Sequence, residues 1–150
     1  MRIHARLPAI LAASFILTAT LFGAARAAPE GGPAGIWQTQ AGDAKVQVSR
    51  CGGSLCGKVV WLRQPTDSAG RPQLDDKNQN PSLRTRPIIG IQLFIDMKPS
   101  APNTWTGRIY NADDGQSYSS TVSQIDAGRL EVRGCVGALC GSETWSRTTR

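Results

Sequence analysis

Short apolar or alternating segments, separated by turn residues, make up most of the chain after an apolar stretch near the N-terminus. Beyond that first stretch, apolar residues do not repeat with the spacing of an α-helix. Gly, Asp, Asn and Pro instead interrupt the pattern about every 8–15 positions. This arrangement is typical of an antiparallel all-β domain.

Eight segments carry a strand pattern, and most are joined by tight turns. A set of about eight strands in simple up-and-down order can close into a barrel, which removes exposed sheet edges and can hold one small ligand. We therefore expect a small antiparallel up-and-down barrel, with a two-sheet β-sandwich as the alternative. The predicted strands are residues 35–39, 45–50, 55–63, 86–96, 104–111, 116–125, 129–135 and 139–147.

One connection is longer than the others, because residues 64 to about 85 show no strand pattern. They are rich in Asp, Asn, Gln, Pro and Arg, and connections of this length are usually functional or disordered. We expect this 64–86 loop to be a place for contact with another protein or with the cell wall. The alternative is structural, with the two arginines paired to Asp75 or Asp76. The candidate contact residues are Asp75, Asn80, Arg84 and Arg86.

The segment Asp76–Asn80 is similar to the first ligands of a calcium-binding loop. The similarity ends there, because Pro81 stands where such a loop needs Gly and Pro87 stands where it needs a bidentate Glu. We therefore predict no metal and a solvated loop whose Asn and Asp side chains stabilise turns.

The N-terminus has the three-part layout of a secretory signal. Arg2 and Arg6 precede the apolar run 7–23, and residues 25–27 form an A-x-A cleavage pattern. The run is too short and wrongly flanked for a membrane anchor. We predict a signal peptide over 1–27 and a single domain over 28–150, with no membrane span in the mature form. The expected location is the periplasm, with the extracellular space as the alternative.

Removal of that signal changes the chemistry that the chain can offer. The formal charge falls from +6 to about +3, and the single histidine, His4, is lost. Catalysis that needs histidine and His-ligated zinc are then excluded from the mature chain. A small net charge without basic clusters does not indicate nucleic-acid binding. We expect no cofactor, and the oligomeric state stays open.

The four cysteines form two C-x4-C motifs with an internal similarity. The motifs share both cysteines, the third-position Gly, a Leu, the Gly after the second Cys and a Trp at the same later offset. We call these two segments the cysteine motifs. Their matching residues are Cys51, Gly53, Leu55, Cys56, Gly57 and Trp61 in the first, and Cys135, Gly137, Leu139, Cys140, Gly141 and Trp145 in the second.

An even number of cysteines in an exported protein favours disulfides. A short Gly-rich turn between two strands brings its flanking residues about 4.5–5.5 Å apart, within reach of a disulfide. We therefore predict Cys51–Cys56 and Cys135–Cys140, while pairings between the two motifs stay open. A zinc site of four cysteines is a further alternative. A redox site is not favoured, because it needs C-x-x-C at a helix N-terminus.

The chain as a whole resembles a family of small exported bacterial proteins known as domain of unknown function 2147. The resemblance covers most of the mature chain in order, and it implies no activity, because none is assigned to the family. One departure is Ala112, where a Pro is expected before the acidic turn. The matching segments are residues 35–37, 55–62, 80–90, 105–111, 114–118 and 134–147.

A second resemblance, to lipocalin-like barrels, rests on two places in the chain. Those proteins begin with Gly-x-Trp on the first strand and carry an Arg on the last strand that packs over this Trp. Here Gly35-Ile36-Trp37 and Arg147 occupy these places. The resemblance implies that Trp37 and Arg147 close one end of a barrel through a cation–π contact.

Three functions remain at this stage. The first is binding of a small apolar or amphipathic ligand inside the barrel, with the alternative that the same residues merely fill it. The second is an envelope protein that acts through the 64–86 loop. The third is an enzyme that uses carboxylates, which we do not favour, and we assign no catalytic residue. The candidate ligand-binding residues are Trp61, Trp105, Ile91, Leu93 and Tyr118.

Overall fold

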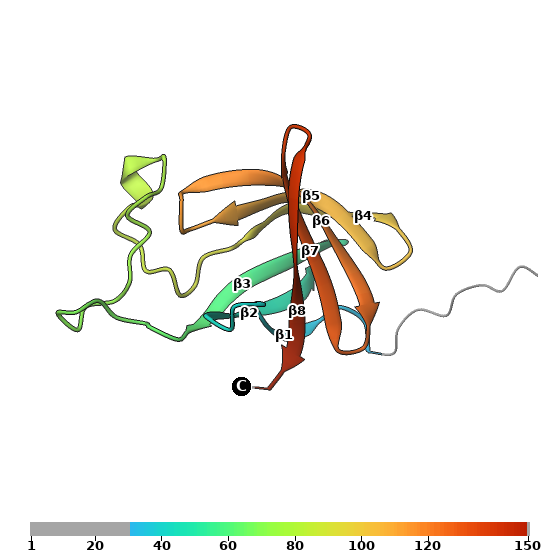
Figure 1. The fold of residues 1–150 in the computed structure, drawn as a ribbon, viewed down its shortest axis with the longest axis horizontal. Coiled ribbons are helices and arrows are strands. Elements are labelled where there is room, and N and C mark those ends of the chain that lie inside the picture. Colours follow the sequence, from blue (N-terminus) through green and yellow to red (C-terminus); the bar gives the residue numbers. More distant parts are fainter. Residues whose placement is uncertain (1–30, 150) are drawn as a thin grey trace, which may run out of the picture.

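Within residues 31–149, eight antiparallel strands form a closed barrel (Figure 1). The computed structural model describes residues 31–149, so the predicted signal peptide over 1–27 lies outside the described residues. Among residues 31–149, no helix is long and apolar enough to cross a membrane. The elements are β1 (Gly35–Gln38), β2 (Ala44–Cys51), β3 (Ser54–Leu62), the short 3-10 helix η1 (Pro81–Leu83), β4 (Phe94–Ala101), β5 (Thr104–Asn111), β6 (Gln116–Asp126), β7 (Arg129–Val136) and β8 (Leu139–Thr148).

Each strand pairs with the next along the chain, and β1 pairs with β8 to close the barrel. In that last pair Trp37 lies opposite Arg147. The predicted barrel is thus confirmed over the β-sandwich. Seven of the eight predicted strands agree with the structure to within one residue at each end, because alternation and turn residues mark them clearly.

The prediction for the fourth strand, residues 86–96, is wrong. β4 spans Phe94–Ala101, and residues 63–93, which we call the long connection, contain no regular strand. Gly90 has a φ of +105°, which interrupts an extended backbone. The backbone of this part bonds to β3 only at separate points, such as Gly90 N to Val59 O at 2.8 Å and Leu93 N to Gly57 O at 2.7 Å. An apolar run signals burial but does not by itself specify a strand.

Side chains fill the barrel at one end, which we call the closed end. This end carries the start of β1, the end of β8 and the turn between β6 and β7. The guanidinium of Arg147 lies 4.2 Å from the ring centroid of Trp37 and donates to the carbonyls of Gly32 and Ala34 at 2.6 and 2.7 Å. The buried apolar residues that pack this part are Trp37, Val48, Leu55, Met97, Trp105, Val122 and Leu130.

Both predicted disulfides are present. Cys51 and Cys56 are 5.9 Å apart at Cα, and Cys135 and Cys140 are 4.1 Å apart. All four cysteines lie in the described part of the chain, and none is free. Each disulfide therefore joins the two strands of one hairpin, β2–β3 or β7–β8, and the pairings between the two motifs do not occur.

Candidate ligand-binding cavity

The other end of the barrel, which we call the open end, contains a cavity of about 790 Å³. The β1–β2, β5–β6 and β7–β8 sides of the barrel and the long connection surround it. Pockets for small ligands have volumes of about 300–1,000 Å³ and mostly apolar walls. The apolar residues of this wall include Val59, Leu62, Ile88, Leu93, Ile109, Val132 and Trp145.

Inward-facing glycines leave this space open. Successive side chains on a strand alternate between its faces, so Gly134 lies on the same inner face as the buried Val132. It pairs with Gly141 on β8, and both glycines border the cavity. A Cβ at position 134 would lie 3.7 Å from the Cβ of Tyr118, an ordinary contact. A side chain could therefore occupy position 134, and its absence widens the cavity.

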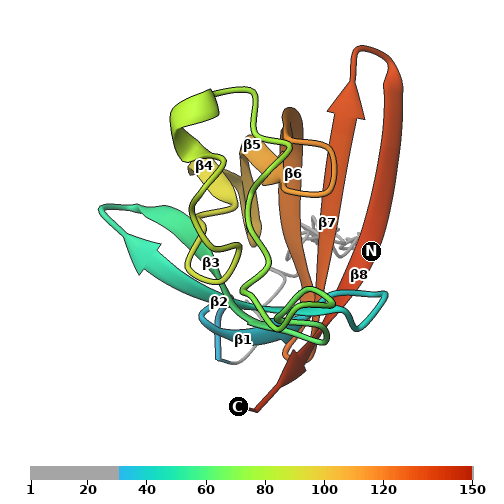
Figure 2. The same cartoon turned by 90° about the vertical axis from the view of Figure 1, so that its left-hand side faces the viewer.

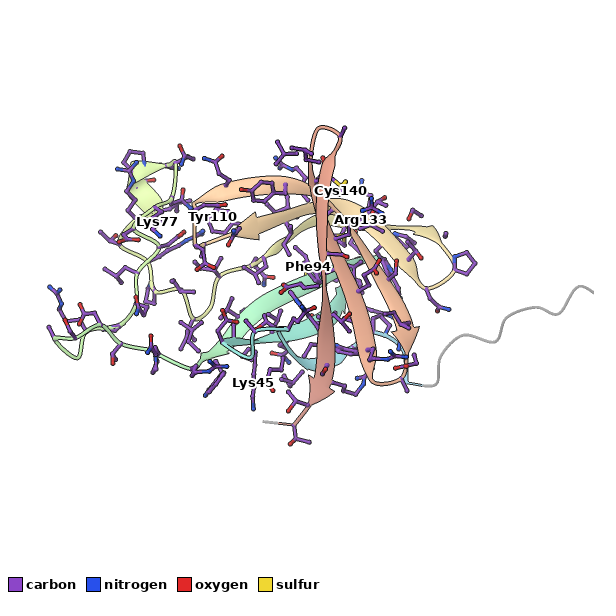
Figure 3. The ribbon with its side chains drawn as sticks, in the orientation of Figure 1. Lys45, Lys77, Phe94, Tyr110, Arg133 and Cys140 are labelled. Carbon is purple, nitrogen blue, oxygen red and sulfur yellow. A yellow bond between two sulfur atoms is a disulfide. The ribbon has the colours of Figure 1, made fainter. Side chains whose placement is uncertain are left out.

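The cavity floor is aromatic. The rings of Phe94 and Trp145 are stacked with centroids 5.8 Å apart and an angle of 12° between their planes. Phe94 points into the barrel (Figure 3) and packs against the backbone of Gly57. A Cβ at position 57 would lie only 2.8 Å from Phe94 Cδ2, so this packing requires glycine. Trp145 borders the cavity, whereas Phe94 does not border it and stacks on Trp145 within the buried core.

The cavity wall carries one acidic side chain on the inner face of a strand. Glu143 is two residues before Trp145 on β8 and lies opposite Val132, so it shares their inward face. Its Oε1 accepts a hydrogen bond of 2.7 Å from Trp145 Nε1. At the rim, Arg63 donates to the carbonyls of Ala41 and Gly42 at 2.7 and 3.1 Å. Arg63 thereby fixes the β1–β2 turn beside the cavity.

Tyr118 and Asp114 form a second polar contact near the rim. The hydroxyl of Tyr118 donates to Asp114 Oδ2 at 2.5 Å, and this bond, together with partial burial, raises the pKa of Tyr118. Partial burial acts to raise the pKa of Asp114, but hydrogen bonds from Tyr118, Gln116 and Asn111 outweigh it and the pKa lies below its usual value. Asp114 is therefore an ionised acceptor at neutral pH.

A buried polar cluster, which we call the anchor cluster, holds the long connection against β5. Asp75 is fully buried, and its carboxylate accepts hydrogen bonds from Tyr110, Asn78 and Arg86 at 2.5, 2.8 and 2.9 Å. Tyr110 is buried on β5 next to Ile109, and both residues border the cavity. Burial is the main cause that raises the pKa of Tyr110, and its bond to Asp75 adds to the effect. The cluster thus satisfies a buried carboxylate that would otherwise be costly.

Two further contacts join the long connection to the β5–β6 turn. Lys77 Nζ donates to the carbonyl of Asp113 at 2.7 Å. The backbone at Gly115 lies so close to the Lys77 carbonyl that a Cβ there would be 1.8 Å from its oxygen. Figure 2 shows the long connection crossing this side of the barrel, and Figure 3 shows Lys77 and Tyr110 near each other at this end. The long connection is therefore part of the cavity's frame.

Of the five residues that we expected to line a ligand site, two line the cavity and three do not. Leu93 and Tyr118 line the cavity. Ile91 and Trp105 are buried in the core but do not line it. Trp61 contradicts the expectation, since it is 38% exposed and lies under the ammonium of Lys45 at 5.3 Å.

A β-bulge explains the position of Trp61. The register between β2 and β3 shifts between Lys45 and Val46, because Val46 pairs with Val59 whereas Lys45 pairs with Trp61. The extra residue, Val60, reverses the alternation beyond it. Leu62, rather than Trp61, consequently lines the cavity. Strand periodicity alone does not reveal such a bulge.

The four residues that we expected on an interaction surface instead form contacts that stabilise the loop. The prediction of an exposed contact residue is wrong for Asp75, which is fully buried and pairs with Arg86 at 2.8 Å. Asn80 Oδ1 accepts from the backbone of Ser82 at the start of η1, and Arg84 donates to the carbonyl of Asn78. The Arg86–Asp75 pair matches the structural alternative for the loop, whereas Arg84 bonds to a backbone carbonyl instead of to Asp75 or Asp76.

Sequence reasoning missed Glu143, Gly134 and Gly141 as cavity residues, and it missed Tyr110 and Asn78 as anchors. The alternation within 139–147 already places Glu143 on the face of Trp145 and could have found it. Tyr110 had no such signal, because it lies 35 positions from Asp75 in the sequence. Among residues 31–149, no group of three or more His, Cys, Asp or Glu side chains could hold a metal ion.

An eight-stranded up-and-down barrel with one packed end and a cavity at the other defines the lipocalin-like class of proteins. The chain belongs to the family described as "Uncharacterized protein conserved in bacteria (DUF2147)", which it matches over residues 35–147. Among solved structures it is similar to protein HP1028 from the human pathogen Helicobacter pylori, which is described as a member of the lipocalin family. The two are 25% identical, with a TM-score of 0.66 over 77% of this chain and 82% of that chain. No curated protein matches the chain.

Proposed function

We propose that the protein is a non-enzymatic binding protein that holds a small apolar or amphipathic ligand in the open-end cavity. The observation that carries the proposal is the contrast within one barrel, in which the core fills the closed end and about 790 Å³ stays open beside Trp145. The similarity to a protein described as a lipocalin supports this function.

The wall composition supports an apolar or amphipathic ligand. Aliphatic side chains and the indole of Trp145 border the inner part, and charged or amide groups border the rim. A ligand in such a site buries its apolar part against the wall and directs its polar end to the rim. The fixed turns at the rim mean that the site is largely formed before the ligand enters, which lowers the entropic cost of binding.

A binding experiment with the neutral fluorescent dye N-phenyl-naphthylamine tests the proposal. We expect saturable one-site binding, with an affinity that falls at least about tenfold in Gly134→Val, because the new side chain projects into the cavity. Ser119→Val is the matched control, since Ser119 is exposed on β6 and does not border the cavity. It should bind the dye as the unaltered protein does.

Circular dichroism should show the same β-sheet spectrum for both variants. Absence of saturable binding by the unaltered protein would contradict the proposal. Equal affinity of a folded Gly134→Val variant would also contradict it, because the dye would then bind elsewhere.

We also propose that the protein acts outside the cytoplasm, in the periplasm or beyond the cell. Its two disulfides support this, because such bonds form and persist in oxidising compartments. The intact mass of protein recovered from the periplasm should correspond to cleavage after Ala27. A cytoplasmic protein of full-length mass would contradict this part of the proposal.

A further inference from the structure

The charges around the cavity differ in sign from the charge of the chain. The whole chain has a formal charge of +6. The residues that border the cavity include three carboxylates, from Asp43, Asp113 and Glu143, and one cation, Arg63. A concave site lined mainly by one sign of charge, with apolar walls, concentrates ions of the opposite sign. The open end is thus a locally acidic site on a basic protein.

Glu143 is the carboxylate best placed to meet a ligand. It is half-buried on the inner face of β8, and the indole N–H of Trp145 holds one of its oxygens at 2.7 Å. This bond fixes the carboxylate beside the aromatic floor and leaves its other oxygen atom available to accept. Asp43 and Asp113 lie at the exposed rim, where water screens their charge more strongly.

Among the described residues that border the cavity, the one cation, Arg63, is already engaged. The Nε and Nη2 atoms of Arg63 donate to the carbonyls of Gly42 and Ala41. The nearby Lys77 ammonium donates to the carbonyl of Asp113 in the β5–β6 turn and does not itself border the cavity. An anionic ligand would therefore meet three carboxylates with little compensation, whereas a cationic group would gain from all three.

We propose that the cavity selects amphipathic ligands whose polar end is a cationic amine, with the apolar part on the aromatic floor and the amine against Glu143. This inference rests on the proposed function, because it assigns the ligand class of the same cavity. It predicts discrimination by head group among ligands with the same apolar chain.

Three decyl compounds test the inference by calorimetry at neutral pH, below the concentrations at which they form micelles. They are decylammonium, 1-decanol and decanoate. We expect decylammonium to bind at least about tenfold tighter than decanoate, with 1-decanol between them. Added salt should weaken the binding of decylammonium and leave that of 1-decanol nearly unchanged.

Two variants locate the effect. Glu143→Gln should weaken decylammonium about tenfold and leave 1-decanol within about twofold, because only the charge is removed. The amide oxygen of Gln can still accept from Trp145 Nε1, so the wall should keep its geometry. Asp96→Asn is the matched control, since Asp96 is an exposed carboxylate on β4 that does not border the cavity. It should change none of the three affinities.

The outcomes separate this inference from the proposed function. Equal affinities for the three compounds would overturn the preference for a cation while the binding cavity stands. Tightest binding of decanoate, lost in Arg63→Gln, would overturn it as well and assign the head group to Arg63. Failure of all three compounds, together with failure of the neutral dye, would overturn both proposals.

Discussion

Leu55 in the β2–β3 hairpin is 1% exposed, whereas Leu139, at the same place in the β7–β8 hairpin, is 81% exposed. Each cysteine motif has its disulfide and a glycine of positive φ, +81° at Gly53 and +56° at Gly137, but the strand registers differ. Cys51 lies opposite Ser54, whereas Cys135 lies opposite Cys140. The shared residues therefore produce a disulfide-linked hairpin in each case and nothing more. What surrounds each turn depends on the neighbouring strands.

Neighbouring strands explain the contrast. Leu55 lies opposite Met97 of β4, so this hairpin is part of the wall of the packed end. The tip of the β7–β8 hairpin extends beyond the rest of the sheet, as Figures 1 and 2 show. The two tryptophans show the opposite contrast. Trp145 of the second motif is buried beside the cavity, and Trp61 of the first motif lies outside the barrel. Identical residues at the same offset in the two motifs thus contribute very different amounts to the free energy of unfolding.

The tryptophan pair should show the largest difference. Trp145→Ala should lower the free energy of unfolding by about 3–5 kcal/mol, because it removes a fully buried ring that stacks on Phe94. Trp61→Ala should cost less than about 1 kcal/mol, because its ring is already partly in water. Urea unfolding measures both. Similar losses would contradict the assigned positions of the two rings.

The leucine pair comes next. Leu55→Ala should cost about 2–4 kcal/mol through the cavity that it leaves at the packed end. Leu139→Ala should change the free energy of unfolding by less than about 0.5 kcal/mol, because its side chain is in water in the folded and the unfolded state. A large loss from Leu139→Ala, measured by the same urea titration, would mean that the hairpin tip is covered in solution.

The glycine pair should show the smallest difference. In Gly57→Ala the new methyl group would meet the Phe94 ring, and we expect a loss of about 1–3 kcal/mol from overpacking. In Gly141→Ala the methyl group meets nothing within 4 Å, so stability should stay within about 0.5 kcal/mol. Thermal unfolding followed by circular dichroism compares the two. A Gly57→Ala variant as stable as Gly141→Ala would contradict the packing of Phe94 on this backbone.

Most strands and both disulfides could be predicted from the sequence, because these features depend on neighbours in the chain. Alternation marks a strand with one buried face, and a Gly-rich turn brings its two cysteines together. The fourth strand was misplaced because burial of Ile91 and Leu93 does not require a regular strand. The bulge at Val60 could not be predicted either. One inserted residue reverses the direction of the side chains that follow it, and it leaves no mark in the local composition.

The candidate site was less predictable than the strands. Leu93 and Tyr118 were found because they lie in apolar or aromatic strand patterns. Pairing of Asp75 with a loop arginine was one of two alternatives, but the burial of Asp75 was not predicted, since it depends on Tyr110, which lies 35 positions away. A polar residue in a loop gives the same local signal whether it is solvated or anchors the loop.

The sequence by itself determined the local elements of this protein: where strands begin and end, which turns need glycine and which cysteines can meet across a turn. Only the tertiary structure decided which of two similar hairpins is buried, that the barrel stays hollow at one end, and that the long connection is fastened to β5. The physical reason is that turns and alternation arise between residues close in the chain. Burial and cavities arise between strands that closure of the barrel brings together.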